Sequence, residues 1–160
     1  MKIAFLQDFF DTEIIGGAEQ NDSVLLNHLN NIEGLHVVPV HTYMVQHVIE
    51  CYDFFIVSNF VRLSENIKKY LIQKGNYIIY EHDHKYVANR NPAAFKNFIA
   101  PDNQIVNKDF YMRAKKVFVL SDICKSVIEK NLGLANVHNI GCSLWSDQKL
   151  DILAGAASAE

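Results

Sequence analysis

The sequence predicts an α/β domain, a Rossmann-like fold of three layers with a mostly parallel sheet. Short apolar runs alternate along the chain with longer amphipathic stretches, which is the pattern of βαβ units. Two of these runs, at 54–57 and 117–120, are apolar without alternation, as expected of strands that helices cover on both faces. The 160 residues suit a single domain with one substantial core.

Six segments are predicted to form strands. Each is a short run rich in apolar, β-branched or aromatic residues and is bounded by polar or glycine-containing turns. In chain order these segments are 2–7, 36–40, 53–57, 77–80, 117–120 and, with a weaker pattern, 137–140. Because strands in βαβ units run parallel, we expect their carboxyl ends to meet at one edge of the sheet.

Three helices are predicted between the strands, at about 18–31, 64–74 and 122–132. Apolar residues recur at helical spacing in each of them and therefore share one face. In the first helix this face carries Ile32, and in the third it carries Ile123, one turn before an apolar valine. We expect these faces to pack against the sheet.

Start and stop signals agree with the two later helices. Ser64 precedes one of them as a candidate N-cap, and Gly75 follows it. Either Ser121 or Asp122 is placed to cap the other, and Gly133 ends it. The agreement of cap, period and stop favours a helix at both places.

The segment 83–107 has a different composition from the rest of the chain. Asparagines and prolines recur along it, so it is predicted to be a long loop with at most one short helical turn. Loops longer than ~15 residues in compact domains tend to be functional or mobile, and we expect this one to be the most mobile part. Residues 1–147 are expected to form the domain, and the small, polar end at 148–160 the start of an interdomain linker or a truncated tail.

Composition and charge exclude several classes of protein. The net charge of −3 gives no reason to expect nucleic acid as a partner, and membrane contact is expected to be peripheral at most. No stretch approaches the ~20 apolar residues of a membrane span. Cys51, Cys124 and Cys142 lack Cys-x-x-Cys spacing, which indicates reduced thiols in a cytoplasmic protein and neither a zinc site nor a disulfide framework.

A glycine motif, Gly16-Gly17-Ala18-Glu19, follows the first strand and opens the first helix. Glycines let a ligand approach the backbone, and the free amides of a helix start attract phosphate. The motif is neither Gly-x-Gly-x-x-Gly nor a Walker loop, and a Gly-Gly pair also serves simply as a turn, so both roles stay open for Gly16 and Gly17. Glu19 would repel a phosphate, and we expect it to tie down the loop through backbone amides.

A histidine motif, Tyr80-Glu81-His82-Asp83-His84, stands at the carboxyl end of the fourth predicted strand. Ligands of open parallel sheets bind just outside such ends. His82 and His84 would share one side of an extended segment, which is one arrangement for binding a metal. A metal site needs a third ligand, however, and the sequence does not supply one. A core or capping histidine is the second possibility, and a substrate contact by His82 is the third and the one we favour.

Ser121 lies between the fifth strand and the helix that follows it. By propensity alone it is an N-cap. The sequence has no Gly-x-Ser-x-Gly elbow, and no cysteine has an obvious general base. Nucleophilic hydrolysis therefore has little support.

The order of these motifs resembles the GT4 family of retaining glycosyltransferases. The first strand, the glycine motif, His82-Asp83 after a strand, and the strand that ends at Ser121 follow one another as they do in that family. The stretch 137–141 resembles the strand and turn that close the family's amino-terminal domain, although it reads Asn-Ile-Gly-Cys where Asn-Gly-x-Asp is commoner. The resemblance covers most of the chain but only the first half of a typical member.

The resemblance implies a GT-B architecture, in which two Rossmann-like domains face a cleft and no metal is bound. This chain would be the amino-terminal, acceptor-side domain of a glycosyltransferase, inactive as a fragment. His82 would be the catalytic residue, reaching the donor sugar near its reacting carbon. Gly16 and Gly17 would lie against the donor diphosphate, and Ser121 on the floor of the cleft. The implied substrate-binding set is Gly16, Gly17, Asp83, His84 and Ser121.

The same resemblance implies the partners. A nucleotide-diphosphate sugar would be the donor substrate, with no separate cofactor, and a glycan or a lipid-linked molecule the acceptor. A missing carboxyl-terminal Rossmann-like domain would supply the paired glutamates that hold the nucleotide. The alternative is a stand-alone Rossmann-like nucleotide-binding or interaction module without catalytic activity. A receiver-type regulator would need an aspartate after the third strand, where this sequence has Val57-Ser58-Asn59.

Overall fold

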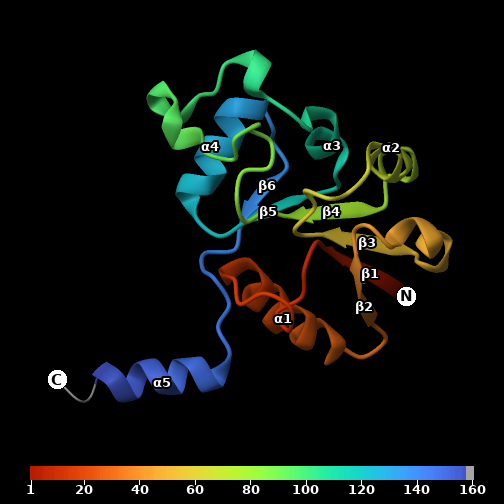
Figure 1. The fold of residues 1–160 in the computed structure, drawn as a ribbon, viewed down its shortest axis with the longest axis vertical. Helices are drawn as coiled ribbons and strands as arrows, with labels where there is room; N and C mark the ends of the chain where they lie inside the picture. The colour runs from red at the N-terminus through yellow and green to blue at the C-terminus, as the bar shows by residue number, and fades with distance from the viewer. Residues whose placement is uncertain (158–160) are drawn as a thin grey trace.

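Helices pack on both faces of a parallel sheet in the computed structural model, which describes residues 1–157 (Figure 1). Residues 158–160, the last part of the predicted tail, lie outside the described residues. Within 1–157 the sheet has six strands in the order β2-β1-β3-β4-β5-β6, and each strand runs parallel to its neighbours. The predicted three-layer, Rossmann-like α/β fold is confirmed.

The strands lie where the apolar runs predicted them, to within one residue at either end. In chain order they are β1 Lys2–Gln7, β2 His36–His41, β3 Phe54–Val57, β4 Tyr77–Tyr80, β5 Val117–Val119 and β6 Val137–Asn139. Ala4 of β1 pairs with Phe55 of β3, and Ile56 of β3 pairs with Ile78 of β4. Rows of apolar side chains therefore cross the sheet on both faces.

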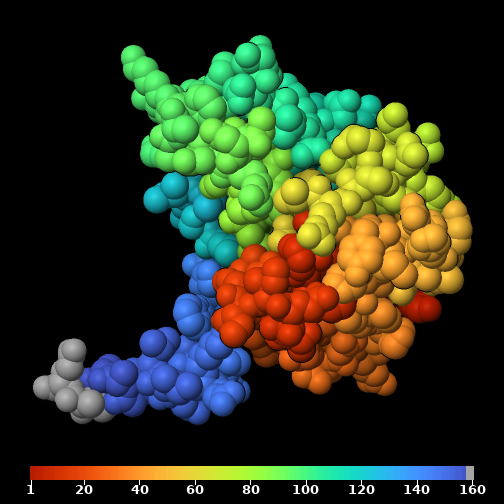
Figure 2. All heavy atoms as spheres, in the orientation of Figure 1, coloured from red at the N-terminus to blue at the C-terminus, as the bar shows by residue number. Residues whose placement is uncertain are grey.

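The helices are distributed unevenly over the two faces. Three of them, with a short 3₁₀ segment, cover one face, and α1 covers part of the other (Figure 1). The helices within residues 1–157 are α1 Gly17–Asn30, α2 Glu65–Lys74, α3 Lys108–Arg113, α4 Asp122–Leu132 and α5 Asp147–Ala157. The helix α5 projects from the body of the molecule (Figures 1 and 2).

The predicted caps of α2 and α4 are confirmed. The Ser64 hydroxyl accepts a hydrogen bond from the amide of Ile67, and the Ser121 hydroxyl accepts one from the amide of Cys124. Both helices end at a glycine in the left-handed conformation, Gly75 with φ 63° and the glycine after Leu132 with φ 69°. Only glycine adopts this backbone without a steric penalty, which is why the stop signals were readable from the sequence.

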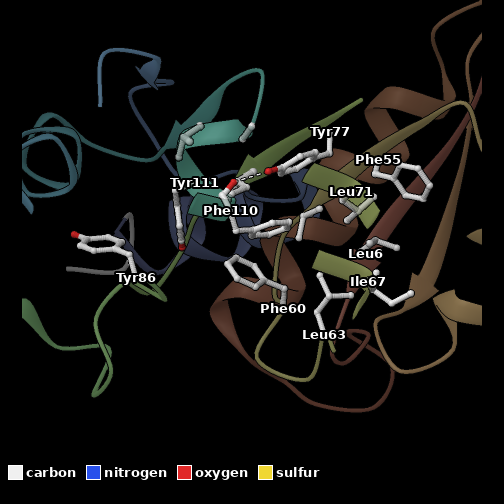
Figure 3. Packing of buried hydrophobic residues seen from close by; sticks show 14 of the residues in the cluster. Leu6, Phe55, Phe60, Leu63, Ile67, Leu71, Tyr77, Tyr86, Phe110 and Tyr111 are labelled. Carbon is white, nitrogen blue, oxygen red and sulfur yellow. Dashed lines mark hydrogen bonds between the residues drawn. The ribbon is translucent and has the colours of Figure 1, made fainter. Parts of the chain in front are cut away.

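The larger core lies under α2, α3 and α4 and contains a group of aromatic rings (Figure 3). The ring of Tyr77 stacks on that of Phe110 with 4.8 Å between centroids, and its hydroxyl donates a 2.6 Å hydrogen bond to the Phe110 carbonyl oxygen. The ring of Phe60 meets that of Phe110 edge to face at 5.3 Å. These buried rings join the helices to β4, and each contributes about 1.5–3 kcal/mol of apolar burial.

A smaller core lies under α1. Ile3, Phe5 and Val37 point from the sheet to Leu25 and Leu29 of the helix. Beyond these leucines the sheet face stays open, as an apolar groove of about 260 Å³ that reaches across β4 and β5. One helix is not wide enough to cover six strands.

Two residues expected to face the core are exposed instead. Ile32 is 51% exposed because α1 ends at Asn30 and the chain turns before Gly34. Ile123 is 72% exposed, while Val127 of the same helix is buried. The position of Ile123 in the first turn of α4 places it beyond the sheet edge, where helical spacing alone gives no burial.

The long segment has more regular structure than predicted. Instead of one helical turn it contains three short 3₁₀ helices, Pro92–Ala94, Lys96–Phe98 and Asp102–Gln104. An antiparallel bridge between Val87 and Ile105 closes the segment at its base. The sequence also did not predict α3 or α5, since α3 spans only six residues and the apolar residues of α5 are exposed. No helix among residues 1–157 combines the length and the apolar character that a membrane span requires.

Candidate functional site

The carboxyl ends of β1, β3 and β4 meet at one edge of the sheet, and a buried polar residue follows each of them. Asp8, after β1, accepts hydrogen bonds from the Thr42 hydroxyl at 2.5 Å and from the amide of Val61 at 2.7 Å. A third bond comes from the amide of Arg62 at 3.1 Å. Both oxygens of Asp8 are thus occupied by hydrogen bonds that join neighbouring loops, so we assign Asp8 a structural role.

A pocket of about 370 Å³ opens at this edge, and we call it the carboxyl-edge pocket. It lies between the start of α1, the end of β4 and the connection from β6 to α5. Its lining residues are Gly17, Ala18, Gln20, Asn21, Val24, His82, Asp83, Leu120, Ser143, Leu144, Trp145, Ser146 and Lys149. Gly17 and His82 thus line the same pocket, and the expectation that the glycine motif and the histidine motif share an edge is confirmed.

The start of α1 presents an uncapped helix end to this pocket. Gly16 is the N-cap residue and supplies no side chain to bond the first amides. A Cβ atom on Gly17 would meet no atom within 4 Å, so the space in front of this residue is open. Free amides and the positive end of the dipole of a 14-residue helix attract an anion at such a position.

Gly16 has a different role from Gly17. A Cβ atom at Gly16 would lie 2.1 Å from a carboxylate oxygen of Glu19, so a larger residue here would displace the end of this side chain. The other carboxylate oxygen of Glu19 accepts a 3.2 Å hydrogen bond from the Asn59 side-chain amide. Glu19 was expected to bind backbone amides, and this expectation is wrong. Its partner is the side-chain amide of Asn59, which lies in the loop after β3.

His82 is held at the pocket by a buried carboxylate. Its Nε2 lies 2.9 Å from Oδ1 of Asp22, and the two side chains are 7% and 1% exposed. The Ser58 hydroxyl, directly after β3, donates to the same carboxylate at 2.6–2.7 Å. The Tyr80 ring meets the imidazole edge to face at 4.6 Å. These contacts fix the ring and leave its Nδ1 for the pocket.

Burial raises the pKa of Asp22 above its ordinary value. The hydrogen bond and charge of His82 act in the opposite direction, as do the bonds from Ser58, without outweighing burial. Asp22 and His82 thus form a hydrogen-bonded pair of a buried acid and an imidazole at the pocket wall.

Asn21 adds an unpaired donor to the pocket. Its side chain is 2% exposed, and its Oδ1 accepts a hydrogen bond from the Tyr80 hydroxyl. Its Nδ2 is buried and has no partner among the described residues. A buried amide nitrogen without a partner costs about 1–3 kcal/mol, and a ligand oxygen in the pocket would remove that cost.

The connection between β6 and α5 forms the remaining wall. Trp145 lines the pocket while half of its surface stays exposed. Lys149 lines it as well and donates a hydrogen bond to the Gln20 side chain of α1. This ammonium places a positive charge near the start of α1.

Asp83 lines the pocket from within a charged cluster. It forms an ion pair with Arg90 at 2.9 Å and another with Lys85, which is buried. Lys85 also lies 3.3 Å from the buried carboxylate of Glu81, which in addition accepts a hydrogen bond from the Tyr111 hydroxyl. Burial opposes ionisation of Glu81, but Lys85 and Tyr111 outweigh it and lower its pKa. The cluster anchors the base of the segment that follows β4.

His84 and Ser121 do not line the pocket. His84 has a φ of 58°, so the chain bends there and its imidazole turns to the hydroxyl of Tyr86, 2.8 Å from Nδ1. The expectation that His82 and His84 share one side of an extended segment is therefore wrong. Ser121 uses its hydroxyl as the N-cap of α4. A substrate contact by either residue stays a prediction.

Sequence reasoning missed Asn21, Asp22, Ser58 and Lys149. Ser58 and His82 lie 36 and 60 residues from the carboxylate that joins them, and Lys149 lies 129 residues from Gln20. Polar residues in the first turns of a predicted helix at a sheet edge were the one available signal. Among residues 1–157 no group of three or more histidine, cysteine, aspartate or glutamate side chains is arranged to hold a metal ion.

Comparisons of the chain with protein-family models, with curated proteins and with solved structures found no match.

Proposed function

We propose that this chain is the amino-terminal, acceptor-side domain of a retaining glycosyltransferase with the GT4 pattern. The full-length enzyme would move a sugar from a nucleotide-diphosphate sugar to a glycan or lipid-linked acceptor. The observation that carries the proposal is the convergence on one pocket of an open helix start at Gly17, an unpaired buried donor on Asn21 and an imidazole held by Asp22.

Each of these groups matches one part of such a donor. The positive end of α1 and the ammonium of Lys149 suit the diphosphate, which gains negative charge as the bond to the sugar breaks. Nδ1 of His82 suits a sugar hydroxyl, because Asp22 already engages the other ring nitrogen. Asn21 offers its free N–H to a further hydroxyl or phosphate oxygen. Positioning of this kind brings the reacting carbon and the leaving oxygen into line.

The proposed reaction needs no nucleophile from this chain, because the acceptor supplies the attacking oxygen. In agreement with this, no cysteine is among the residues that line the pocket. With a second domain closing over the pocket, the donor would be held from both sides. We place the protein in the cytoplasm, because Cys51, Cys124 and Cys142 are all free thiols.

The test uses the full-length protein, and the proposal requires that its reading frame continue into a second Rossmann pattern with Glu-x₇-Glu. Incubation with a panel of nucleotide-diphosphate sugars, with EDTA present, is expected to release nucleoside diphosphate. His82→Ala should lose this activity, and His138→Ala, on the exposed side of β6, should keep it. If no donor in the panel is consumed by a folded protein, the proposal fails.

The isolated chain separates the proposal from the alternative of a stand-alone module. Alone it offers one wall of the cleft, so we expect nucleotide sugars to bind in the millimolar range or not at all. A Kd of about 1 mM corresponds to only ~4 kcal/mol of binding free energy. A low-micromolar Kd by calorimetry would instead favour a complete binding module.

A further inference from the structure

A second pocket, of about 190 Å³, lies between the loop after β3, the helix α2 and the two ends of the segment 83–107, and we call it the lysine pocket. It shares no lining residue with the carboxyl-edge pocket. Three cations line it, Lys68 of α2 with Lys85 and Arg90 of the segment, and no aspartate or glutamate is among its lining residues. A chain whose net charge is −3 thus gathers three positive charges at one small hollow.

The ammonium group of Lys68 is buried and held in place. Its Nζ donates a 2.7 Å hydrogen bond to the carboxylate of Glu65 and a 2.8 Å hydrogen bond to the side-chain oxygen of Asn107. The side chain of Lys68 is only 10% exposed. A ligand therefore meets a cation whose position is already fixed, and it does not have to order this side chain.

Lys85 is buried more deeply, with a side chain that is 2% exposed. Its Nζ lies 3.3 Å from a carboxylate oxygen of Glu81 and also forms an ion pair with Asp83. Burial opposes the positive charge of Lys85, but the two carboxylates outweigh it and raise the pKa of the ammonium. The ring of Phe60 has both ammonium groups near it, with Nζ of Lys68 5.9 Å and Nζ of Lys85 5.3 Å from its centroid. An anion in the pocket is therefore attracted by both charges.

Each of the three cations keeps at least one N–H group for a ligand. An ammonium group has three N–H donors and a guanidinium group has five. Lys68 and Lys85 each have two hydrogen-bond or ion-pair partners at Nζ among residues 1–157. Arg90 has one such partner there, the carboxylate of Asp83 at 2.9 Å. A phosphate group, with three strong acceptor oxygens and about two negative charges at pH 7, matches these donors better than a carboxylate does.

We propose that the lysine pocket binds the phosphate group of a second ligand. A neighbouring hollow of about 480 Å³, which shares three residues with the pocket, provides space for the rest of this ligand. Asp83 lines the carboxyl-edge pocket and forms ion pairs with Lys85 and Arg90, so the ligand would lie beside the proposed donor site. Identifying this ligand as the acceptor rests on the proposed function, whereas the phosphate site itself does not.

Amide NMR of the isotope-labelled chain locates the site, with inorganic phosphate as the probe. We expect a Kd of about 1 mM at low salt that rises as sodium chloride is added, because the attraction is electrostatic. Shift changes should concentrate at Ala88, Arg90 and Asn107, which line the lysine pocket. Changes confined to Gly17 and its neighbours would show binding in the carboxyl-edge pocket alone and would overturn the proposal. So would the absence of any saturable change.

Vesicles separate the two sources of such a phosphate, a lipid headgroup and a soluble compound. The chain is sedimented with phosphatidylcholine vesicles that contain phosphatidic acid and with vesicles of phosphatidylcholine alone. Cosedimentation with the former only assigns the phosphate to a lipid. Binding of inorganic phosphate without cosedimentation assigns it to a soluble ligand.

Arg90→Asn tests whether the cations make the site. Asparagine tolerates the positive φ of 55° at this exposed position, and Lys96→Asn, which removes an exposed charge of the same segment outside the pocket, is the matched control. We expect Arg90→Asn to weaken phosphate binding about tenfold, the scale of one charge-assisted hydrogen bond, and Lys96→Asn to leave it unchanged. Lys68→Gln should weaken it by a similar factor. Wild-type affinity in folded Arg90→Asn and Lys68→Gln proteins would overturn the proposal.

Discussion

His82 and His84 are two residues apart, yet they belong to opposite sides of the end of β4. His82 faces α1, where Asp22 holds its Nε2 at 2.9 Å, and lines the carboxyl-edge pocket. His84 does not line the pocket, and its Nδ1 lies 2.8 Å from the hydroxyl of Tyr86. The difference shows that two histidines of one short motif can have separate surroundings, because a single left-handed residue redirects the chain.

The two regions also differ at the helix starts beside them. At the pocket, a buried acid is shielded from water and an open helix start awaits an anion. At α4, the helix start is closed instead, because the Ser121 hydroxyl accepts a hydrogen bond from the amide of Cys124. The predictions that follow are chosen so that each disturbs one region and leaves the other as a control.

Under the proposed function, the largest effect is expected from His82→Ala in the full-length protein. Loss of a positioned polar group near the reacting carbon should lower kcat/KM by about 10²-fold or more. His84→Ala should lower it far less, since its side chain turns away from the pocket. Steady-state kinetics decide this. If His84→Ala is the damaging change, the wrong histidine has been assigned to the sugar, and if both are silent the site assignment fails.

Gly17→Ala should weaken donor binding by about tenfold in the full-length enzyme, which is 1.4 kcal/mol. The added methyl group meets no protein atom but occupies the space through which a phosphate reaches the helix start. Folding should be unharmed, because alanine favours a helix by up to about 1 kcal/mol over glycine. Gly155→Ala in α5 is the control, and calorimetry measures both. Unchanged donor affinity in Gly17→Ala would remove this glycine from the donor site.

Asp22→Asn should change how stability depends on pH. Asp22 has an ordinary pKa of 3.8 and a raised one when folded, so its contribution to stability is full below pH 3.8 and is lost as pH rises through the folded pKa. The stability of the wild type relative to Asp22→Asn should therefore fall as the pH rises above 3.8. Urea unfolding across this range measures it, with exposed Asp151→Asn as the control. A difference that grows with pH would mean that His82 and Ser58 outweigh burial.

The smallest effect concerns motion of the segment 88–99, which follows both histidines in the chain. Most of the segment 88–99 is exposed, while Val117 and Val119 of β5 are buried. Amide hydrogen exchange should therefore be faster through 88–99 than in β5, because loops with few buried contacts open at low free energy. We expect this segment to border the acceptor in the full enzyme. Exchange as slow there as in β5 would contradict its mobility.

The sequence by itself determined the sheet and the ends of α2 and α4. Apolar runs without alternation indicate buried strands, and glycines such as Gly75 and Gly133 end helices because of local backbone sterics. Both signals depend only on residues that are close together in the sequence. The tertiary structure alone decided which polar residues meet. The carboxylate of Asp22 joins side chains that follow β3 and β4, and the direction of His84 follows from one backbone angle. Such contacts depend on how strands and helices are placed in space. The residues that make them are far apart in the sequence, so no periodic pattern predicts the contacts.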